Sequence, residues 1–366
     1  MKEGRTLSEV AVELDRIRKS AKDFTIPCAA LLYEAKDNRL NVDGLGEFRL
    51  SELAHGQVAE HLGIPKKYYD RMREEQPVLL EENVNTWLQS QPATERMLRT
   101  VDGSVRAFLS NKYRPLDNVD MLEAVLPTLE QSGCRIESCD ITEKRFYLKA
   151  VSNNVEFVLP EETAQQAAAR MRDGTHERRD DVLAAGLVCS NSEVGCGGLT
   201  VEPLIWRRVC SNGAIISEAA FKKLHIGKST SNGEGSYEFF RDDTRLADDR
   251  ALWLKVRDCV AHVFEQVNFE GIVKRMDAAR ADLIEAPAAK VIEVTSQMFS
   301  LNEREGEGVL AALLREGDMS RFGLMNALTR HSQELPDYER ATDFERLGGK
   351  VLDLGAKDWK RIANAH

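Results

Sequence analysis

The chain has 366 residues, of which 42% are hydrophobic and 30% are charged. This length allows two or three domains with buried cores, and the composition excludes a chain that is disordered throughout. The formal net charge of −10, from 50 basic and 60 acidic residues, excludes a uniformly basic nucleic-acid coat protein. A local basic surface stays open, because binding follows the field at a site and not the total charge.

Membrane, secretion and metal signals are weak. The chain contains no run of about eighteen apolar residues, and the stretch from Met1 to Arg5 lacks an apolar segment. We therefore expect a cytoplasmic protein with no membrane contact. The seven cysteines include no C-x-x-C pair, and Cys189, Cys196 and Cys210 are too widely spaced for zinc ligands. Reduced thiols are expected, with no metal and no cofactor.

Residues 1–92 are expected to be mostly helical, with a helix-turn-helix-like segment. Apolar residues at helical spacing end at Leu62-Gly63-Ile64, where Gly63 suits a tight turn and Pro65 suits the start of a second helix. That helix carries basic and aromatic side chains: Lys66, Lys67, Tyr68, Tyr69, Arg71 and Arg73. It is typical of a duplex-reading helix, or of a structural hairpin whose lysines face water.

Residues 93–228 are expected to form the core. Strands at 97–101 and 104–109 flank Asp102-Gly103, which suits a two-residue type I′ turn. A helix is predicted from Asp117 or Asn118 to Gly133, followed by strands near 135–141, 145–151, 183–189 and 198–210. This order predicts an α+β fold: a central, largely antiparallel sheet with a packed helix, flanked by N- and C-terminal helical regions.

Residues 229–366 are expected to hold a linker and a helical region. The linker is the apolar-free stretch Ser229–Ser236, and an earlier charged stretch, Pro160–Asp181, predicts a surface arm or lid. Asp248 or Asp249 is expected to cap the first C-terminal helix. The spacing of Ser300–Glu303 predicts a capping box before the next apolar run, and a short helix is expected over 322–329.

Basic side chains recur along the core. Residues 203–228 hold five Lys or Arg against one acid, Glu218, within a chain of net charge −10. This asymmetry predicts a groove in which cations bind phosphates and Tyr113 or Trp206 stacks on bases. The alternative is solvated strand faces, since residues 95–150 hold nine basic and nine acidic residues. The candidate nucleic-acid-binding residues are Arg96, Arg99, Arg106, Lys112, Tyr113, Arg114, Lys144, Arg145, Arg207, Arg208, Lys222, Lys223, His225 and Lys228.

Two polar loops follow predicted strands. Their Ser, Asn and Gly residues fit either ligand-contacting loops or tight turns. The loop candidates are Asn191, Ser192, Glu193, Asn212 and Gly213. Gly227-Lys228-Ser229-Thr230 resembles the end of a P-loop, but Lys222 stands where its first glycine is required. No nucleophile, base and orienting group can be recognised together, so the sequence gives catalysis no support.

Several motifs in order resemble the uncharacterised phage/plasmid-like protein family, a domain of unknown function found on phages, prophages and plasmids. They are Arg106–Arg114, Asn191–Gly195, Val209–Gly213, Leu347–Leu352 and the stretch from Ala54-His55 to Tyr69. Ser211 departs from the threonine expected there. The resemblance covers nearly the whole chain and implies a mobile-element setting.

The order of strands and helix is also similar, by fold-level analogy, to the core of Rad52/RecT-type single-strand annealing proteins. That similarity implies single-stranded DNA in a basic groove and a homo-oligomer. The leading hypothesis is therefore single-stranded DNA binding, extending to strand annealing in recombination on a mobile genetic element. The alternatives are a duplex DNA-binding regulator that uses the helix-turn-helix-like segment, and an interaction protein that binds no DNA.

Overall fold

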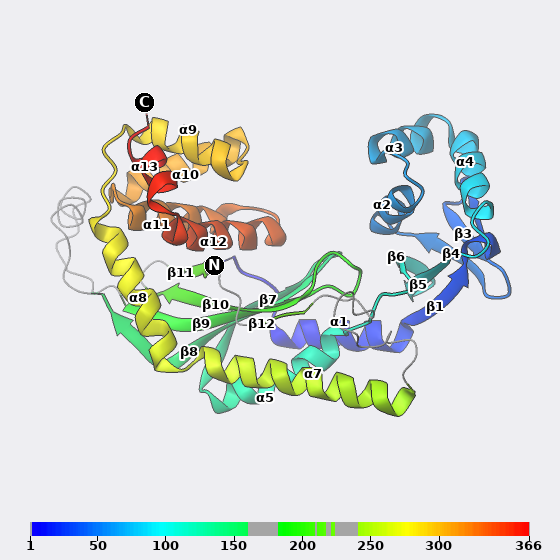
Figure 1. Ribbon diagram of the computed structural model, residues 1–366, viewed down its shortest axis with the longest axis horizontal. Coiled ribbons are helices and arrows are strands. Elements are labelled where there is room, and N and C mark those ends of the chain that lie inside the picture. Colours follow the sequence, from blue (N-terminus) through cyan, green and yellow to red (C-terminus); the bar gives the residue numbers. More distant parts are fainter. Residues whose placement is uncertain (1, 160–181, 209–210, 217–220, 224–240, 366) are drawn as a thin grey trace.

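The computed structural model describes residues 2–159, 182–208, 211–216, 221–223 and 241–365. Over these ranges the chain is α+β, with two six-stranded sheets and helices around them (Figure 1). The expected fold class is confirmed. The surface arm at 160–181, the linker at 229–236, His225 and Lys228 fall outside the described residues.

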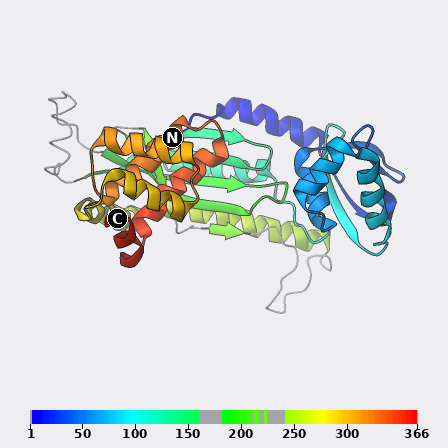
Figure 2. The ribbon, with the colours of Figure 1, turned by 90° about the horizontal axis from the view of Figure 1, so that it is seen from above.

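An N-terminal module is built on the first sheet, at one end of the molecule (Figure 2). Its order is β1 (Lys22–Pro27), β5 (Glu95–Val101), β6 (Ser104–Ser110), β4 (Gly46–Leu50), β3 (Arg39–Val42) and β2 (Leu31–Glu34). All neighbours are antiparallel except β4 and β6. A separate apolar core joins this sheet to α2 (Glu52–His61), α3 (Lys66–Glu75) and α4 (Pro77–Gln89).

The hairpin β5–β6 turns where the sequence predicts. Asp102 and Gly103 have φ of +49° and +73°, the left-handed angles that a type I′ turn needs. The hairpin does not belong to the central sheet, because β5 pairs with β1 and β6 pairs with β4. The domain boundary expected at residue 92 is therefore wrong, and the first sheet ends at Ser110. Strands β1 to β4 are only four to six residues long, and β1 and β4 are largely exposed, which left these strands without a clear sequence signal.

The central sheet is antiparallel throughout, as expected. Its order is β11 (Asn212–Ile215), β10 (Leu199–Arg207), β9 (Val182–Asn191), β8 (Phe146–Val158) and β7 (Cys134–Ile141), with β12 (Phe221–Lys223) also paired to β10. One face packs on α1 (Leu7–Ser20), α5 (Asn118–Gln131) and α7 (Asp242–Val263), which lie beneath the sheet in Figure 1.

The opposite face of the central sheet is covered by C-terminal helices. Along β8, Phe146 and Leu148 join the core with α5 and α7, whereas Tyr147 and Val151 pack beside Tyr338 of α12. This alternation is the period-2 geometry of a strand buried on both faces. The helices of this region are α8 (Gln266–Ala281), α9 (Ala288–Phe299), α10 (Glu303–Glu316), α11 (Arg321–His331), α12 (Tyr338–Asp353) and α13 (Ala356–Ala363).

Two expected helix starts differ from the structure. Helix α7 begins at Asp242, so Asp248 and Asp249 lie within it, and both pair with Arg114. The capping box of α10 is formed by Asn302 and Glu305, because Ser300 ends α9 in the left-handed conformation. The helix expected over 322–329 is confirmed as α11. In the described part of the chain, no helix is long and apolar enough to cross a bilayer.

Candidate nucleic-acid interface

The loop after β9 joins the two sheets. The Asn191 side chain donates to the Leu116 carbonyl at 2.7 Å and to Asn118 Oδ1 at 2.9 Å. Ser192 Oγ donates to the Lys144 carbonyl in the β7–β8 turn at 2.7 Å. Asn191 and Ser192 are both fully buried. They therefore stabilise a tight turn, and we assign them no ligand contact.

Glu193 is the centre of this junction and is buried. Its carboxylate accepts from Arg106 Nη1 at 2.6 Å and from the Asn118 backbone N–H, at the start of α5, at 2.7 Å. Its carbonyl accepts from Arg99 Nη1 at 3.0 Å. A carboxylate at a helix N-terminus also interacts favourably with the helix dipole. Glu193 thus holds the N-terminal sheet, α5 and the central sheet together.

Arg99 is committed to structure. It is 2% exposed, and its guanidinium donates to Asp23 at 3.0 Å and to Asp117 at 2.7 Å, besides the Glu193 carbonyl. Burial acts to lower the pKa of Arg99, but Asp117 and Asp23 outweigh burial and raise it. The expected phosphate contact by Arg99 is therefore wrong, since its charge is already neutralised inside the protein.

Arg106 retains donors for a ligand. Only its Nη1 is bonded, to Glu193, whereas Nε and Nη2 are buried and meet no hydrogen-bond acceptor within the described residues. Buried donors without acceptors cost about 1–3 kcal/mol each, so they favour the binding of an acceptor. Both pockets beside this guanidinium include Arg106 and Glu193 in their walls.

The larger of these pockets, which we name the junction cavity, has a volume of about 330 Å³. Five cationic side chains and three carboxylates line its wall, and two of the cations, Arg5 and Arg16, also pair with Asp140 and Asp102 outside the lining. Arg145 donates only to the Ser190 hydroxyl and the Gly198 carbonyl, at 3.0 and 3.1 Å, so its charge meets no carboxylate in the described ranges. The charged lining residues are Arg5, Arg16, Arg106, Lys144, Arg145, Glu13, Glu143 and Glu193.

The smaller pocket, of about 250 Å³, adjoins the junction cavity and is more acidic. Asp23, Asp117 and Asp120 line it together with Arg99 and Arg106. Partial burial, with Asp117 and Glu123 nearby, raises the pKa of Asp120 to about 6. The charge of this wall therefore changes near neutral pH.

Three other arginines predicted to bind nucleic acid form ion pairs within the protein. Arg114 is buried and pairs with Asp248 at 2.7 Å and with Asp249. Arg207 lies 3.5 Å from Glu316, and Arg208 pairs with Glu156. Each of these three charges is matched by a carboxylate. Among the described residues, the cations expected to line a groove along the central sheet therefore do not form a row of unpaired charges.

The remaining candidates divide by exposure. Arg96 stacks over the Phe108 ring, with 4.9 Å from its guanidinium carbon to the ring centroid, and burial lowers its pKa. Lys112 and Lys222 are exposed and Lys223 is partly exposed. Lys144 is exposed at the β7–β8 turn, 3.9 Å from Glu339. Lys144, Arg106 and Arg145 are the predicted cations that the structure gathers around one cavity.

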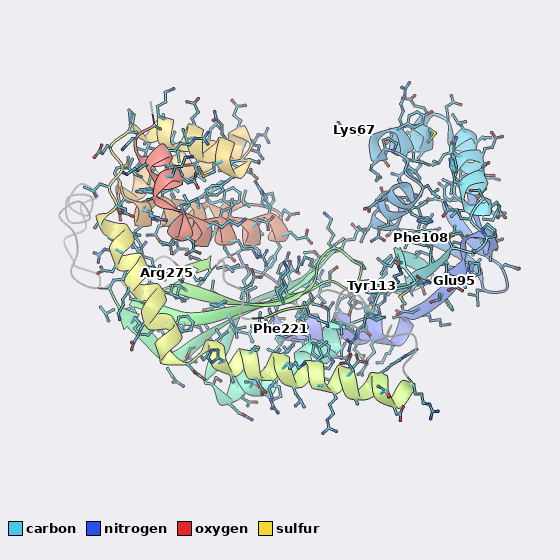
Figure 3. The ribbon with its side chains drawn as sticks, in the orientation of Figure 1. Lys67, Glu95, Phe108, Tyr113, Phe221 and Arg275 are labelled. Atoms are coloured by element: carbon cyan, nitrogen blue, oxygen red, sulfur yellow. The ribbon has the colours of Figure 1, made fainter. Side chains whose placement is uncertain are left out.

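The expected stacking residues are built into the protein. Tyr113 donates its hydroxyl to the Ser192 carbonyl at 2.9 Å and lies where the N-terminal module meets the core (Figure 3). Trp206 is 6% exposed in the core beneath α12. Asn212 is buried and donates to Thr329 at 2.7 Å, and Gly213 packs against Leu204. None of these four presents a free surface to a base.

The helix-turn-helix-like segment exists as α2 and α3, with Gly63 at φ +68° in the turn. Three of the four cations on α3 bind carboxylates: Lys66 pairs with Asp70, Arg71 with Glu75 and Arg73 with Glu52. Tyr69 is fully buried. The remaining outward side chains are Lys67 and Tyr68, a small surface for reading bases.

Sequence reasoning missed the α1 side of the junction cavity. Arg5, Glu13 and Arg16 come from the segment that starts the chain, and Gln57 of α2 donates to the Val194 carbonyl at 2.7 Å. The amphipathic spacing of Val10 and Leu14 could have predicted that α1 has a buried face. It could not have predicted which part of the protein that face packs against.

Metal-binding clusters of His, Cys, Asp and Glu are not found among the described residues. The described cysteines are free, and burial raises the pKa of Cys189 to about 12, so this thiol stays protonated. No family model, no curated protein and no solved structure matches the chain. The family resemblance stays a prediction that depends on the motifs.

Proposed function

We propose that the protein binds single-stranded DNA, and that the junction cavity takes a phosphate of the strand. The observation that carries this proposal is the Arg106 guanidinium, with two buried nitrogens that meet no acceptor in the described structure. A phosphate oxygen is a strong acceptor for such nitrogens. Lys144 and Arg145, at the tip of the β7–β8 hairpin, add charge at the same cavity.

The junction cavity supports a contact with the backbone and not a reading of bases. Its walls offer guanidinium and ammonium groups, whereas Tyr113 and Trp206 are packed inside the protein. Phosphate contacts carry no sequence information by themselves. We therefore expect binding that tolerates any base sequence, as a protein that aligns strands for annealing requires.

The test compares single-stranded DNA, duplex DNA and RNA by fluorescence anisotropy over a range of salt concentrations. Arg145→Gln and Lys144→Gln should each weaken single-strand binding and reduce the salt slope by about one, because each removes one phosphate contact. Lys357→Gln on α13 is the matched control, since it removes the same charge from an exposed site remote from the cavity.

Equal affinity of the cavity variants and the wild type would remove the junction cavity from the proposal. Unchanged anisotropy for every nucleic acid at low salt would reject nucleic-acid binding altogether and favour an interaction protein. Preference for one duplex sequence, lost in Lys67→Gln, would instead support a regulator that uses α3.

A further inference from the structure

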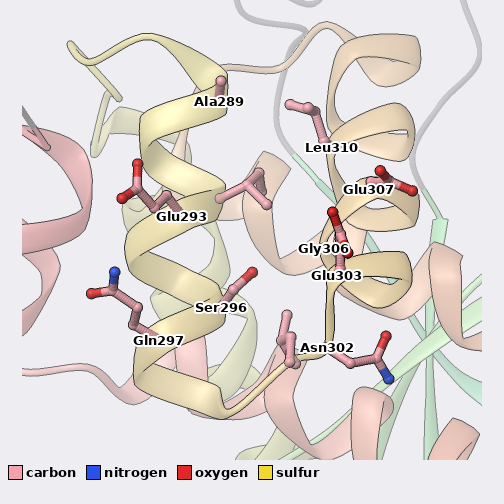
Figure 4. A pocket seen from close by; sticks show the side chains of 11 residues that line it. Ala289, Glu293, Ser296, Gln297, Asn302, Glu303, Gly306, Glu307 and Leu310 are labelled. Carbon is pink, nitrogen blue, oxygen red and sulfur yellow. The ribbon is translucent and has the colours of Figure 1, made fainter.

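A groove of about 450 Å³ runs between α9 and α10, in the C-terminal helical region (Figure 4). Its floor includes Ile292 and Leu310, and Gly306 lets the two helices approach, since a Cβ there would lie 2.9 Å from Ser296 Oγ. Leu314, one turn beyond Leu310, is 61% exposed and extends the apolar strip along α10. An apolar groove that is open to solvent offers a surface on which another protein segment can pack.

The rims of this α9–α10 groove are acidic. Glu293 lies on the α9 side, and Glu303 and Glu307 lie on the α10 side. Neither Glu303 nor Glu307 has a basic partner in the described part of the chain, although they are one helical turn apart and repel each other. A partner with two cations at the same spacing would remove this repulsion.

The exposed face of α3 has that chemistry. Lys67 and Arg71 are one helical turn apart and exposed, and Tyr68, which neighbours Arg71 on the helix surface three residues earlier, is 50% exposed. Lys67 meets no carboxylate within the described residues, and the Arg71–Glu75 pair is a solvent-exposed pair that contributes little. An exposed tyrosine flanked by cations is a common anchor of protein interfaces.

We propose that the α9–α10 groove binds the α3 face of a second copy of this chain. Tyr68 fills the apolar floor, while Lys67 and Arg71 pair with Glu303 and Glu307. The match rests on sign and spacing, since each pair is separated by four residues on a helix. The two surfaces of one molecule cannot meet, because α3 lies in the N-terminal module and α9 lies in the C-terminal helical region at the other end of the molecule (Figure 1; Lys67 is labelled in Figure 3).

This contact is heterologous, because different surfaces of the two copies meet. Each bound copy leaves one groove and one α3 face open, so the assembly grows into a chain or closes into a ring. The inference does not depend on the proposed nucleic-acid binding, and its test contains no nucleic acid.

The experiment is sedimentation velocity of the full chain over a wide range of protein concentration. Wild type should show mass that rises with concentration and falls with added salt. Two charge-reversed proteins are compared with it: Glu303→Lys/Glu307→Lys, which makes the groove basic, and Lys67→Glu/Arg71→Glu, which makes the α3 face acidic. Each alone should lose self-association by about tenfold or more, since like charges then face each other.

Mixing the two reversed proteins supplies the decisive result. The basic groove of one then meets the acidic α3 face of the other, so mixed complexes should form where neither protein associates alone. Lys255→Glu on α7 is the control for a charge reversal elsewhere and should associate like wild type. Tyr68→Ser tests the apolar anchor without changing charge and should also weaken association.

Circular dichroism checks that each variant folds, and Glu307→Lys alone avoids a cation at the start of α10. A wild type that stays monomeric at every concentration overturns the proposal. It is also overturned if both reversed proteins associate like wild type, or if their mixture stays monomeric. Association that persists in all groove and α3 variants would place the self-contact on another surface.

Discussion

Arg106 Nη1 lies 2.6 Å from Glu193 Oε2, so a single ion pair joins β6 of the N-terminal sheet to the loop after β9 of the central sheet. Side-chain exposure is 18% for Arg106 and 5% for Glu193. The same carboxylate accepts from the first N–H of α5. The pair therefore holds two sheets in register and leaves the rest of the Arg106 guanidinium directed at the junction cavity.

Glu193→Ala should destabilise the protein by about 3 kcal/mol, because it leaves Arg106 buried without its counter-charge and the Asn118 N–H without an acceptor. Urea unfolding followed by tryptophan fluorescence measures this loss. Glu123→Ala, which removes an exposed carboxylate, is the control and should change stability little. A Glu193 variant as stable as the control would show that the ion pair does not join the two sheets.

Lys149 and Glu345 form an ion pair beneath α12, with 2.6 Å between Nζ and Oε2 and both side chains fully buried. Burial lowers the pKa of Lys149, although Glu345 opposes this. Lys149→Met or Glu345→Leu alone should each cost about 3–5 kcal/mol, since each strands a buried charge. The double variant should recover most of the loss. Equal losses in the single and double variants, measured by urea unfolding, would exclude this coupling.

The central sheet could be predicted from sequence because its signals are local. The Asp102-Gly103 turn, the apolar runs of β8 and β9 and the helical spacing of α5 each depend on residues close in the chain. The order of the strands could not be predicted in this way, because the pairing of β5 with β1 joins residues that are far apart in the sequence. No local pattern at Lys22–Pro27 indicates its partner.

The candidate site was harder to predict for the same reason. A run of arginines in a sequence shows positive charge but not the carboxylates that meet it in the fold. Asp117 and Asp23 neutralise Arg99 from two other segments, and Asp248 reaches Arg114 from α7. The loop between β9 and β10 decides the state of two further arginines. Its Glu193 binds only one nitrogen of Arg106, and its Gly198 offers Arg145 a carbonyl and no carboxylate.

His55 couples the stability of the N-terminal module to pH. Its Nδ1 lies 2.8 Å from the Tyr69 hydroxyl, its Nε2 bonds Asn38 Oδ1, and the ring is fully buried. Asn38 Oδ1 can only accept, so Nε2 carries the proton and Nδ1 accepts from Tyr69. Burial lowers the pKa of His55 to about 4, so the neutral form is favoured in the folded protein.

The unfolded chain takes up the His55 proton near pH 6.5 and the folded chain only near pH 4. The contribution to stability is therefore present above pH 6.5 and is lost as pH falls towards 4, by about 3 kcal/mol. His55→Gln cannot titrate, so its free energy of unfolding should fall less over this range. Parallel pH curves for the two proteins, measured by urea unfolding, would contradict this assignment.

Gly349, in a motif that carries the family resemblance, has a packing role in this fold. A Cβ at this position would clash with the Ile215 carbonyl of β11, where α12 crosses the sheet. Gly349→Ala should therefore destabilise by about 1–3 kcal/mol, although alanine normally favours a helix. Gly271→Ala in α8 is the control, since no atom lies within 4 Å of its added Cβ. The control should gain stability in thermal melts, and a gain in both proteins would disprove the close approach.

Asp120 should make single-strand binding depend on pH. Because its pKa is about 6, the carboxyl is charged at pH 8 and neutral at pH 5, and its charge adds to that of Asp117 in the wall of the smaller pocket. Loss of this negative charge favours phosphate, so affinity should rise as pH falls through 6. The effect is a few-fold at most, since Asp120 is only partly buried and solvent screens its charge.

Asp120→Asn separates this effect from other titrations. The variant should bind single-stranded DNA at pH 8 as tightly as wild type binds at pH 5, and its affinity should vary less between these pH values. Glu123→Gln removes one negative charge, as Asp120→Asn does, but from an exposed position outside the pocket wall, and it should shift the wild-type curve only slightly. If Asp120→Asn keeps the full pH dependence in anisotropy titrations, the dependence arises from other groups and the acidic pocket does not influence the junction cavity.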